Sequence, residues 1–148
     1  MIKASLNAKA LREKLASMQE RLKRLDPAFL RAAIVVLKRA QDRIRSGGDG
    51  NWPPVKTPPT NRRGLVQGST LYRTGTLFRS LTVGGSGSLY ETIANGVRVG
   101  TNVPYARYQQ EGTRRGIPPR PFLLIDDETA GKVVKTFARY IMTGDDNG

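Results

Sequence analysis

One acidic cluster in the sequence could take part in metal binding or acid–base catalysis. It consists of three consecutive carboxylates, Asp126, Asp127 and Glu128. Such a cluster could bind a metal ion or supply a general acid and base. However, an apolar repeat with helical spacing begins directly after it, at Ala130. Negative charge at a helix N-terminus is stabilised by the helix dipole. We therefore expect these carboxylates to begin a helix, and we expect no metal site.

The chain contains neither cysteine nor histidine. A thiolate nucleophile, a zinc site built on these ligands and a histidine-activated serine are therefore excluded. The glycine-rich run 84–87 lacks the lysine and the strand-to-helix context of a phosphate-binding loop. We predict that the protein is not an enzyme and has no cofactor.

Arginines and tyrosines lie close together between residues 105 and 120, a combination that can bind single-stranded nucleic acid through charge and stacking. None of the helix-turn-helix, zinc-finger or RNA-binding signatures is present. The pattern thus predicts at most a non-specific contact with DNA. The residues concerned are Tyr105, Tyr108, Arg114, Arg115 and Arg120.

The formal net charge of +13 is concentrated in the first part of the chain. Residues 1–63 hold 15 Lys/Arg against 5 Asp/Glu, whereas residues 64–148 hold 10 against 7. Two interpretations stay open at this point. The charge is either a solvated helix face or an attraction to an acidic partner, which would be DNA or a negatively charged protein ring.

The length of 148 residues fits one domain, residues 1–148. No apolar run is long enough to span a membrane, and the N-terminus lacks the apolar core of a signal peptide. We expect a soluble protein that is intracellular when synthesised, with no membrane partner.

The sequence of residues 1–45 predicts a pair of helices. In the first, leucines and a methionine alternate at spacings of four and three, a narrow stripe that suits packing on the next helix or on a neighbouring subunit. Asp26 is expected to cap the second helix, with Pro27 at its first position. That helix should run to Arg45 with an apolar face broad enough to lie across a sheet. The stripe comprises Leu11, Leu15, Met18, Leu22 and Leu25.

Residues 46–74 are rich in proline and glycine and predict an extended, projecting arm. The single tryptophan, Trp52, lies in this arm, and Arg62 and Arg63 form a basic turn. An aromatic side chain on a stiff segment suits docking on a partner, since little entropy is lost on binding. The alternative is that Trp52 folds back onto its own core.

Residues 75–142 predict the sheet and a closing helix. Thr74 should cap a short helix, and Thr82-Val83 should begin a strand. Residues 89–94 should pair with 97–100 across an Asn95-Gly96 turn. We further expect a helix over 105–111 ending at Gly112, a short strand over 120–125 and a helix carrying Ala130 to Ile141. The fold class is therefore α+β, with a small, mainly antiparallel sheet packed by a long helix.

Three segments resemble the phage virion morphogenesis family, the tail-completion proteins of P2-like and Mu-like phages. They are GGDGNWPP (47–54), LYRTGTLFRSL (71–81) and GTNVPYARYQQEG with IPPRPFL (100–112 and 117–123). Gln109 stands where the family usually has histidine, and Pro119 where alanine is common. The resemblance implies a structural virion protein that completes the tail at the head–tail junction and enables joining of the head.

The resemblance also implies a homo-oligomeric ring, a hexamer, that contacts the tail tube and the head or neck connector in the virion after assembly in the host cytoplasm. The competing hypothesis is a basic, non-sequence-specific nucleic-acid-binding or packaging-associated protein. Arg120, between two prolines, is expected to hold loop 112–119 against the domain or an adjacent subunit. We predict interface roles for Trp52, Arg62, Arg63, Tyr105, Gln109, Gln110, Arg114, Arg115, Arg120 and Phe122.

Overall fold

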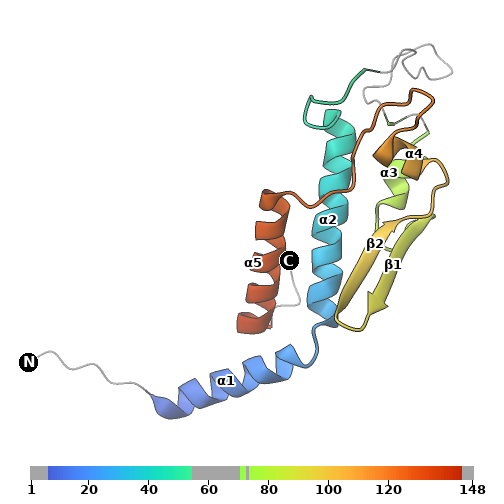
Figure 1. The fold of residues 1–148 in the computed structure, drawn as a ribbon. Helices are drawn as coiled ribbons and strands as arrows, with labels where there is room; N and C mark the ends of the chain where they lie inside the picture. The colour runs from blue at the N-terminus through green and yellow to red at the C-terminus, as the bar shows by residue number, and fades with distance from the viewer. Residues whose placement is uncertain (1–6, 55–70, 73, 145–148) are drawn as a thin grey trace, which may run out of the picture.

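A computed structural model describes residues 7–54, 71–72 and 74–144. Helices and one β-hairpin make up its regular structure, which confirms the α+β class (Figure 1). The predictions for residues 55–70, including those for Arg62 and Arg63, lie outside the described residues. The elements are α1 (Ala8–Leu22), α2 (Asp26–Ser46), α3 (Thr76–Ser80), β1 (Ser88–Ile93), β2 (Gly96–Thr101), α4 (Ala106–Glu111) and α5 (Asp127–Thr143).

The long helix α2 lies at the centre of the molecule. Leu25, and not Asp26, occupies its N-cap position, so the predicted aspartate cap is wrong. Asp26 is instead the first helical residue, where its charge still favours the helix dipole. The helix ends at Gly47, which has φ 66°, a left-handed conformation that suits glycine.

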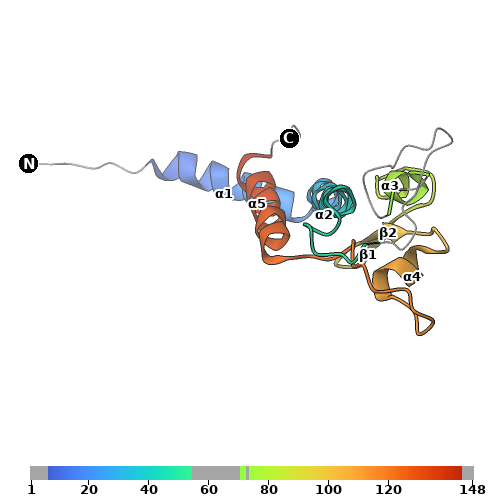
Figure 2. The ribbon, with the colours of Figure 1, turned by 90° about the horizontal axis from the view of Figure 1, so that it is seen from above.

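Two different elements pack on α2. Helix α5 lies along one side and the β-hairpin along the other, and the view from above shows α2 between them (Figures 1 and 2). The α2 residues that these elements cover are largely small, so both can approach the helix closely. The buried residues of α2 are Ala28, Ala32, Ala33, Val36, Leu37, Ala40 and Ile44.

The hairpin forms as expected, but its turn is shifted by one residue. Ile93 pairs with Gly96, so Ala94 and Asn95 form the turn in place of Asn95 and Gly96. In this register Glu91 lies opposite Arg98, and their Oε2 and Nη1 atoms are 2.8 Å apart. Cross-strand pairs of opposite charge favour the observed register over the predicted one.

Two predicted strands are wrong. In the described chain, neither Thr82-Val83 nor residues 120–125 pair with another strand. The second segment finds its hydrogen bonds elsewhere. The Gln110 side chain accepts from the backbone N–H groups of Phe122 and Leu123, both at 3.0 Å, and donates to the Leu123 carbonyl at 2.8 Å. One amide side chain thus takes the place of a neighbouring strand.

The short helix α3 contributes Leu77 to a core shared with α2, and Leu81 directly follows it. The left-handed Gly75 is its N-cap residue, so the predicted Thr74 cap is wrong. The remaining buried apolar members of this core are Leu37, Ala40, Ile44, Val103, Ala106 and Phe122.

Helix α1 extends away from this body (Figure 1). It is held at its C-terminal end, where Arg21 Nη1 donates to the Ile141 carbonyl at 2.8 Å. Nearby, the Tyr140 hydroxyl donates to the Arg24 carbonyl at 2.6 Å. Both bonds attach the end of α1 to the end of α5, so most of the helix stands clear of its own chain.

We predict that Leu37→Ala lowers the free energy of unfolding by about 2–5 kcal/mol, because Leu37 is 2% exposed and its removal leaves a cavity. Ile34→Ala on the same helix is the control, since Ile34 is 49% exposed and should cost well under 1 kcal/mol. Urea unfolding measures both variants. Equal losses would contradict the assigned packing of α2.

Candidate interaction site

The surface around α4 brings together aromatic and basic side chains. Tyr105 and Tyr108 are exposed at the start and middle of this helix. The helix ends at Gly112, with φ 76°. A Cβ at this glycine would lie 2.8 Å from the Ile117 carbonyl oxygen and 2.9 Å from Pro119 N, so only glycine allows the following loop to return so closely.

The loop after Gly112 is closed by its own hydrogen bonds. Thr113 N donates to the Ile117 carbonyl at 2.9 Å, and Ile117 N donates to Thr113 Oγ1 at 3.2 Å. Arg114 and Arg115 are exposed within this closed loop. We call Tyr105, Tyr108, Arg114, Arg115 and Ile117 the α4 surface; all five are exposed.

The α4 surface combines cations with flat, partly apolar side chains. Such a combination can bind an acidic protein surface, and Tyr and Arg are both enriched where proteins meet. It can equally stack on nucleic-acid bases and contact phosphate. Three of the residues predicted for the interface are therefore exposed here, namely Tyr105, Arg114 and Arg115, together with Tyr108, which was predicted only for a DNA contact.

Arg120 lies inside the molecule, with only 4% of its surface exposed. Its Nε and Nη2 atoms both donate to the Pro53 carbonyl, at 3.2 and 3.1 Å. Its backbone N–H donates to the Gln109 carbonyl at 2.7 Å. Burial lowers the pKa of this guanidinium from its usual value. Arg120 thus joins the segment after α2 to the end of α4, directly after the loop 112–119 that we predict it to hold.

Two further predicted interface residues have roles within the fold. Phe122 is buried in the core, and Gln110 bonds the segment that carries it. Both positions are explained by packing and by backbone hydrogen bonding. A partner contact at either of them stays a prediction.

The Trp52 ring packs against its own core, the second of the two alternatives considered. A Cβ on Gly48 would lie 2.3 Å from this ring, so glycine is required there for the ring to fit. The buried Trp52 Nε1 and Gln109 Oε1 both lack a hydrogen-bond partner among the described residues. Gln109 therefore faces the interior through its side-chain oxygen, and its role toward a partner is untested.

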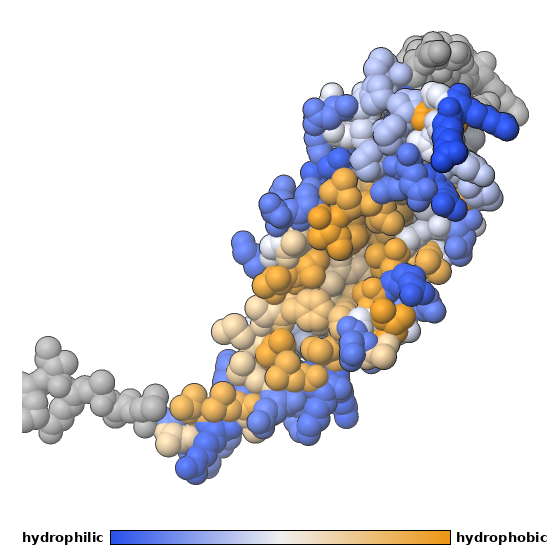
Figure 3. Space-filling model, viewed as in Figure 1, coloured by the Kyte–Doolittle hydropathy of each residue, from blue (hydrophilic) through white to orange (hydrophobic). Residues whose placement is uncertain are grey.

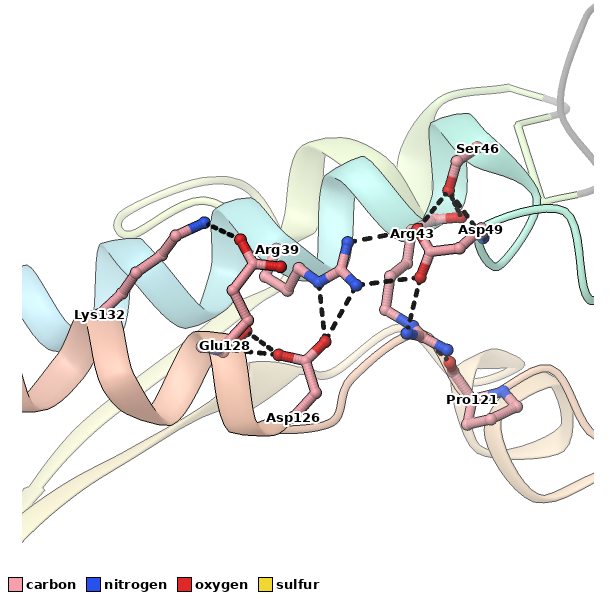
Figure 4. A network of polar contacts seen from close by, with 9 residues as sticks. Arg39, Arg43, Ser46, Asp49, Pro121, Asp126, Glu128 and Lys132 are labelled. Carbon is pink, nitrogen blue, oxygen red and sulfur yellow. Dashed lines mark hydrogen bonds and ion pairs between the residues drawn. The ribbon is translucent and has the colours of Figure 1, made fainter.

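A charged network fastens the start of α5 to the end of α2 (Figure 4). The Arg39 guanidinium lies between two carboxylates, 2.9 Å from Asp126 Oδ2 and 2.9 Å from Asp49 Oδ2. Arg43 Nη1 reaches Asp49 Oδ2 at 3.0 Å, while Arg43 Nε donates to the Pro121 carbonyl at 3.2 Å. The network thus connects two stretches that are distant in sequence, residues 39–49 and residues 121–126.

The network carboxylates are held in their charged form. Hydrogen bonds from the Thr129 hydroxyl and backbone N–H, at 2.5 and 2.8 Å, lower the pKa of Asp126, and Arg39 lowers it further. Burial raises the pKa of Asp49, but hydrogen bonds from Arg39 and Ser46 outweigh it and the pKa falls. The hydrogen bond to Asp126 and then that to Asp49 raise the pKa of Arg39.

Asp126 accordingly caps α5, as the sequence indicated for this cluster. Sequence reasoning missed its partner Arg39 and the second carboxylate that Arg39 binds, Asp49. A usable signal was the spacing of Arg39 and Arg43, which places two cations on one edge of α2. Asp49 has φ 58°, and its position followed from no pattern in the chain.

Within residues 7–54, 71–72 and 74–144, no three acidic side chains cluster in a way that could hold a metal ion. Across the same residues, every helix is too short or too polar to cross a bilayer.

We predict that Asp126→Ala is less stable than Asp126→Asn by about 1 kcal/mol, because asparagine keeps the cap and alanine removes it. The wild type should exceed both variants at neutral pH. Since the folded pKa of Asp126 lies below the unfolded value of about 3.9, its contribution is complete well above that pH. The contribution is lost as the pH falls below 3.9 toward the folded pKa.

Urea unfolding at several pH values between 7 and 3 measures this difference. The stability gap between the wild type and Asp126→Asn should narrow on acidification. A gap that stays constant would show that the charge on Asp126 contributes nothing.

We predict that Arg120→Lys lowers the free energy of unfolding by about 1.5–3 kcal/mol, since lysine cannot donate two bonds to the Pro53 carbonyl in the same geometry. Arg114→Lys, at an exposed position, is the control and should leave stability unchanged. Thermal unfolding compares the two variants. Unchanged stability of Arg120→Lys combined with failed assembly would place the role of Arg120 at a neighbouring subunit.

Comparison with known proteins gives one family. Residues 6–142 match the model of the phage virion morphogenesis family, which covers α1 through nearly all of α5. No curated protein and no solved structure matches this chain. Because the match includes most of the sequence, with its N-terminal helices as well as the α4 segment, the chain belongs to the phage virion morphogenesis family.

Proposed function

We propose that the protein completes the phage tail at the head–tail junction, as a homo-oligomeric ring that allows the head to join. Membership of the family indicates a structural, tail-related role in the virion. The location at the neck, the ring and its six copies go beyond the family and are our proposal. No catalytic step forms part of it.

The observation that carries the proposal is the family match over residues 6–142. Two features of the chain agree with an assembly role. The α4 surface exposes Tyr108 at 54% and two arginines, and further large apolar side chains are exposed on α1, α2 and α5. A chain that acts through contact with neighbours needs such side chains outside its own core.

In this proposal the α4 surface contacts a component of the tail tube or of the head connector. Its arginines would pair with carboxylates of that component, while the two tyrosines supply flat contact area at little cost in side-chain entropy. Arg120, the charged network and Gln110 hold the segments that flank this surface in place.

The alternative is a DNA-binding or packaging-associated protein, and the net charge of +13 favours it. Examination of particles that lack the protein separates the two. Loss of a junction protein should leave DNA-filled heads and unjoined tails in the same lysate. Loss of a packaging protein should leave empty heads, which would overturn our proposal.

The salt dependence of DNA affinity is a second, independent measurement that separates the two hypotheses. A DNA contact that neutralises phosphates should lose affinity with salt, with a log–log slope of roughly −0.9 per phosphate. A protein contact with partly buried pairs should depend on salt less steeply.

We predict that Arg114→Glu combined with Arg115→Glu reduces the yield of joined particles at least tenfold. The reason is that two attractive cations at the α4 surface become repulsive. The matched control is Lys132→Glu with Lys135→Glu, which makes the same charge change at exposed positions of α5. Both variants should keep wild-type circular dichroism, and particle titres measure the outcome. Equal titres for the two variants would remove the α4 surface from the mechanism.

A further inference from the structure

Helix α1 has an apolar stripe that its own chain covers only in part, at Met18 and Leu25. Leu11, Leu15 and Leu22 are 44, 50 and 51% exposed, and none of the residues of α1 is buried by the described chain. An isolated helix of 15 residues is marginal in water, and amphipathic helices gain most of their stability when the apolar side is packed. The stripe therefore lacks the contact that would stabilise this helix.

A second uncovered apolar surface lies on the body of the molecule. Figure 3 shows apolar side chains continuing from α5 across α2 to the hairpin. Val134 on α5 is 67% exposed, and Ile125, just before the helix, is 63% exposed. Helical spacing places Ala130, Val134 and Ile141 on one edge of α5. We call Ile93, Ile125, Ala130, Val134, Phe137 and Ile141 the acceptor face.

The two surfaces match in length. The stripe from Leu11 to Leu22 and the edge from Ala130 to Ile141 each extend over eleven residue steps, about 16 Å at the helical rise. Two helices with apolar edges of equal length can pack side by side along their whole contact.

Their charges are complementary as well. On α1 the basic Arg12 and Lys14 flank the stripe on either side, while Glu13 and Glu20 lie on the opposite side of the helix. On the body, Asp127 lies on the same edge of α5 as Val134. Glu91, on the hairpin at the other border of the acceptor face, is already paired with Arg98. The basic flanks of α1 thus suit the Asp127 border of the acceptor face.

Helix α1 cannot cover the acceptor face of its own chain in this arrangement. The bonds from Arg21 to the Ile141 carbonyl and from Tyr140 to the Arg24 carbonyl fix its C-terminal end at the far end of α5. From there the helix runs outward, and Leu11 and Leu15 lie in the part farthest from the body (Figure 1).

We propose that α1 of one copy packs its leucine stripe on the acceptor face of a neighbouring copy. Each chain supplies one stripe and one acceptor face. Every copy can therefore contact two neighbours, one through its stripe and the other through its acceptor face. Because the two surfaces differ, the contact is head-to-tail, and a contact of this kind closes into a ring when its rotation allows. The inference rests on the proposed ring and names the element that holds it together.

Disulfide trapping tests the contact directly, since the chain has no native cysteine. Leu15→Cys and a size-tagged Val134→Cys are purified separately, mixed and oxidised. The mixed product should form at least tenfold faster than either homodimer, because position 15 of one copy meets position 134 of another. The control pair is Leu15→Cys with Lys132→Cys, on the opposite side of α5, and it should form little product.

Charge insertion gives a second measurement on the same helix. Leu15→Glu should shift the native mass from the ring to the monomer. Ser17→Glu, which adds the same charge off the stripe, should leave the ring intact. Both positions are on an exposed helix, so the fold of the body is unaffected by either change.

Four results would overturn the inference. Leu15→Cys homodimers that form as fast as the mixed product would show α1 paired with α1, and a disulfide within a Leu15→Cys/Val134→Cys monomer would show α1 folded on its own chain. An intact ring that yields no mixed product would reject the contact and leave the proposed function standing. A wild-type chain that stays monomeric in native mass spectrometry and on phage tails would reject the proposed ring itself.

Discussion

Burial of one helix is the constraint on which the rest of the structure depends. Helix α2 supplies seven of the thirteen buried apolar residues in the described part of the chain, and four of these seven are alanines. Small side chains let α5 and the hairpin approach the same helix from two sides. Since a two-stranded hairpin is marginal by itself, its stability here derives from packing against α2.

The helices and the hairpin could be predicted from the sequence because each follows from a periodic pattern in its own residues. Positions 120–125 were misjudged as a strand because an apolar run is compatible with several conformations. The backbone of this segment bonds to the Gln110 side chain and not to another strand. No local pattern in the sequence reveals these bonds to Phe122 and Leu123. The Asn95-Gly96 signal likewise predicts the hairpin but not its register, in which Glu91 lies opposite Arg98.

For the candidate site too, the sequence reveals residue types but not burial or distant partners. Tyr105, Arg114 and Arg115 were recognised by residue type and are exposed, as an interaction surface requires. Arg120 and Phe122 were recognised in the same way but lie inside, because residue type alone does not reveal burial. Arg39 was missed since its partners, Asp49 and Asp126, come from segments that only the folded chain brings together.

The positions of Trp52 and Tyr72 carry a consequence for how this chain can change in evolution. Both residues pack against the same core, which fixes the positions of residues 52 and 72 relative to each other. The entropy of holding two such ends together grows only logarithmically with the number of residues between them, about 0.6 kcal/mol for each doubling. By this relation, the entropic cost of holding Trp52 and Tyr72 together depends only weakly on the number of residues between them, so chain closure sets little limit on the length of that interval.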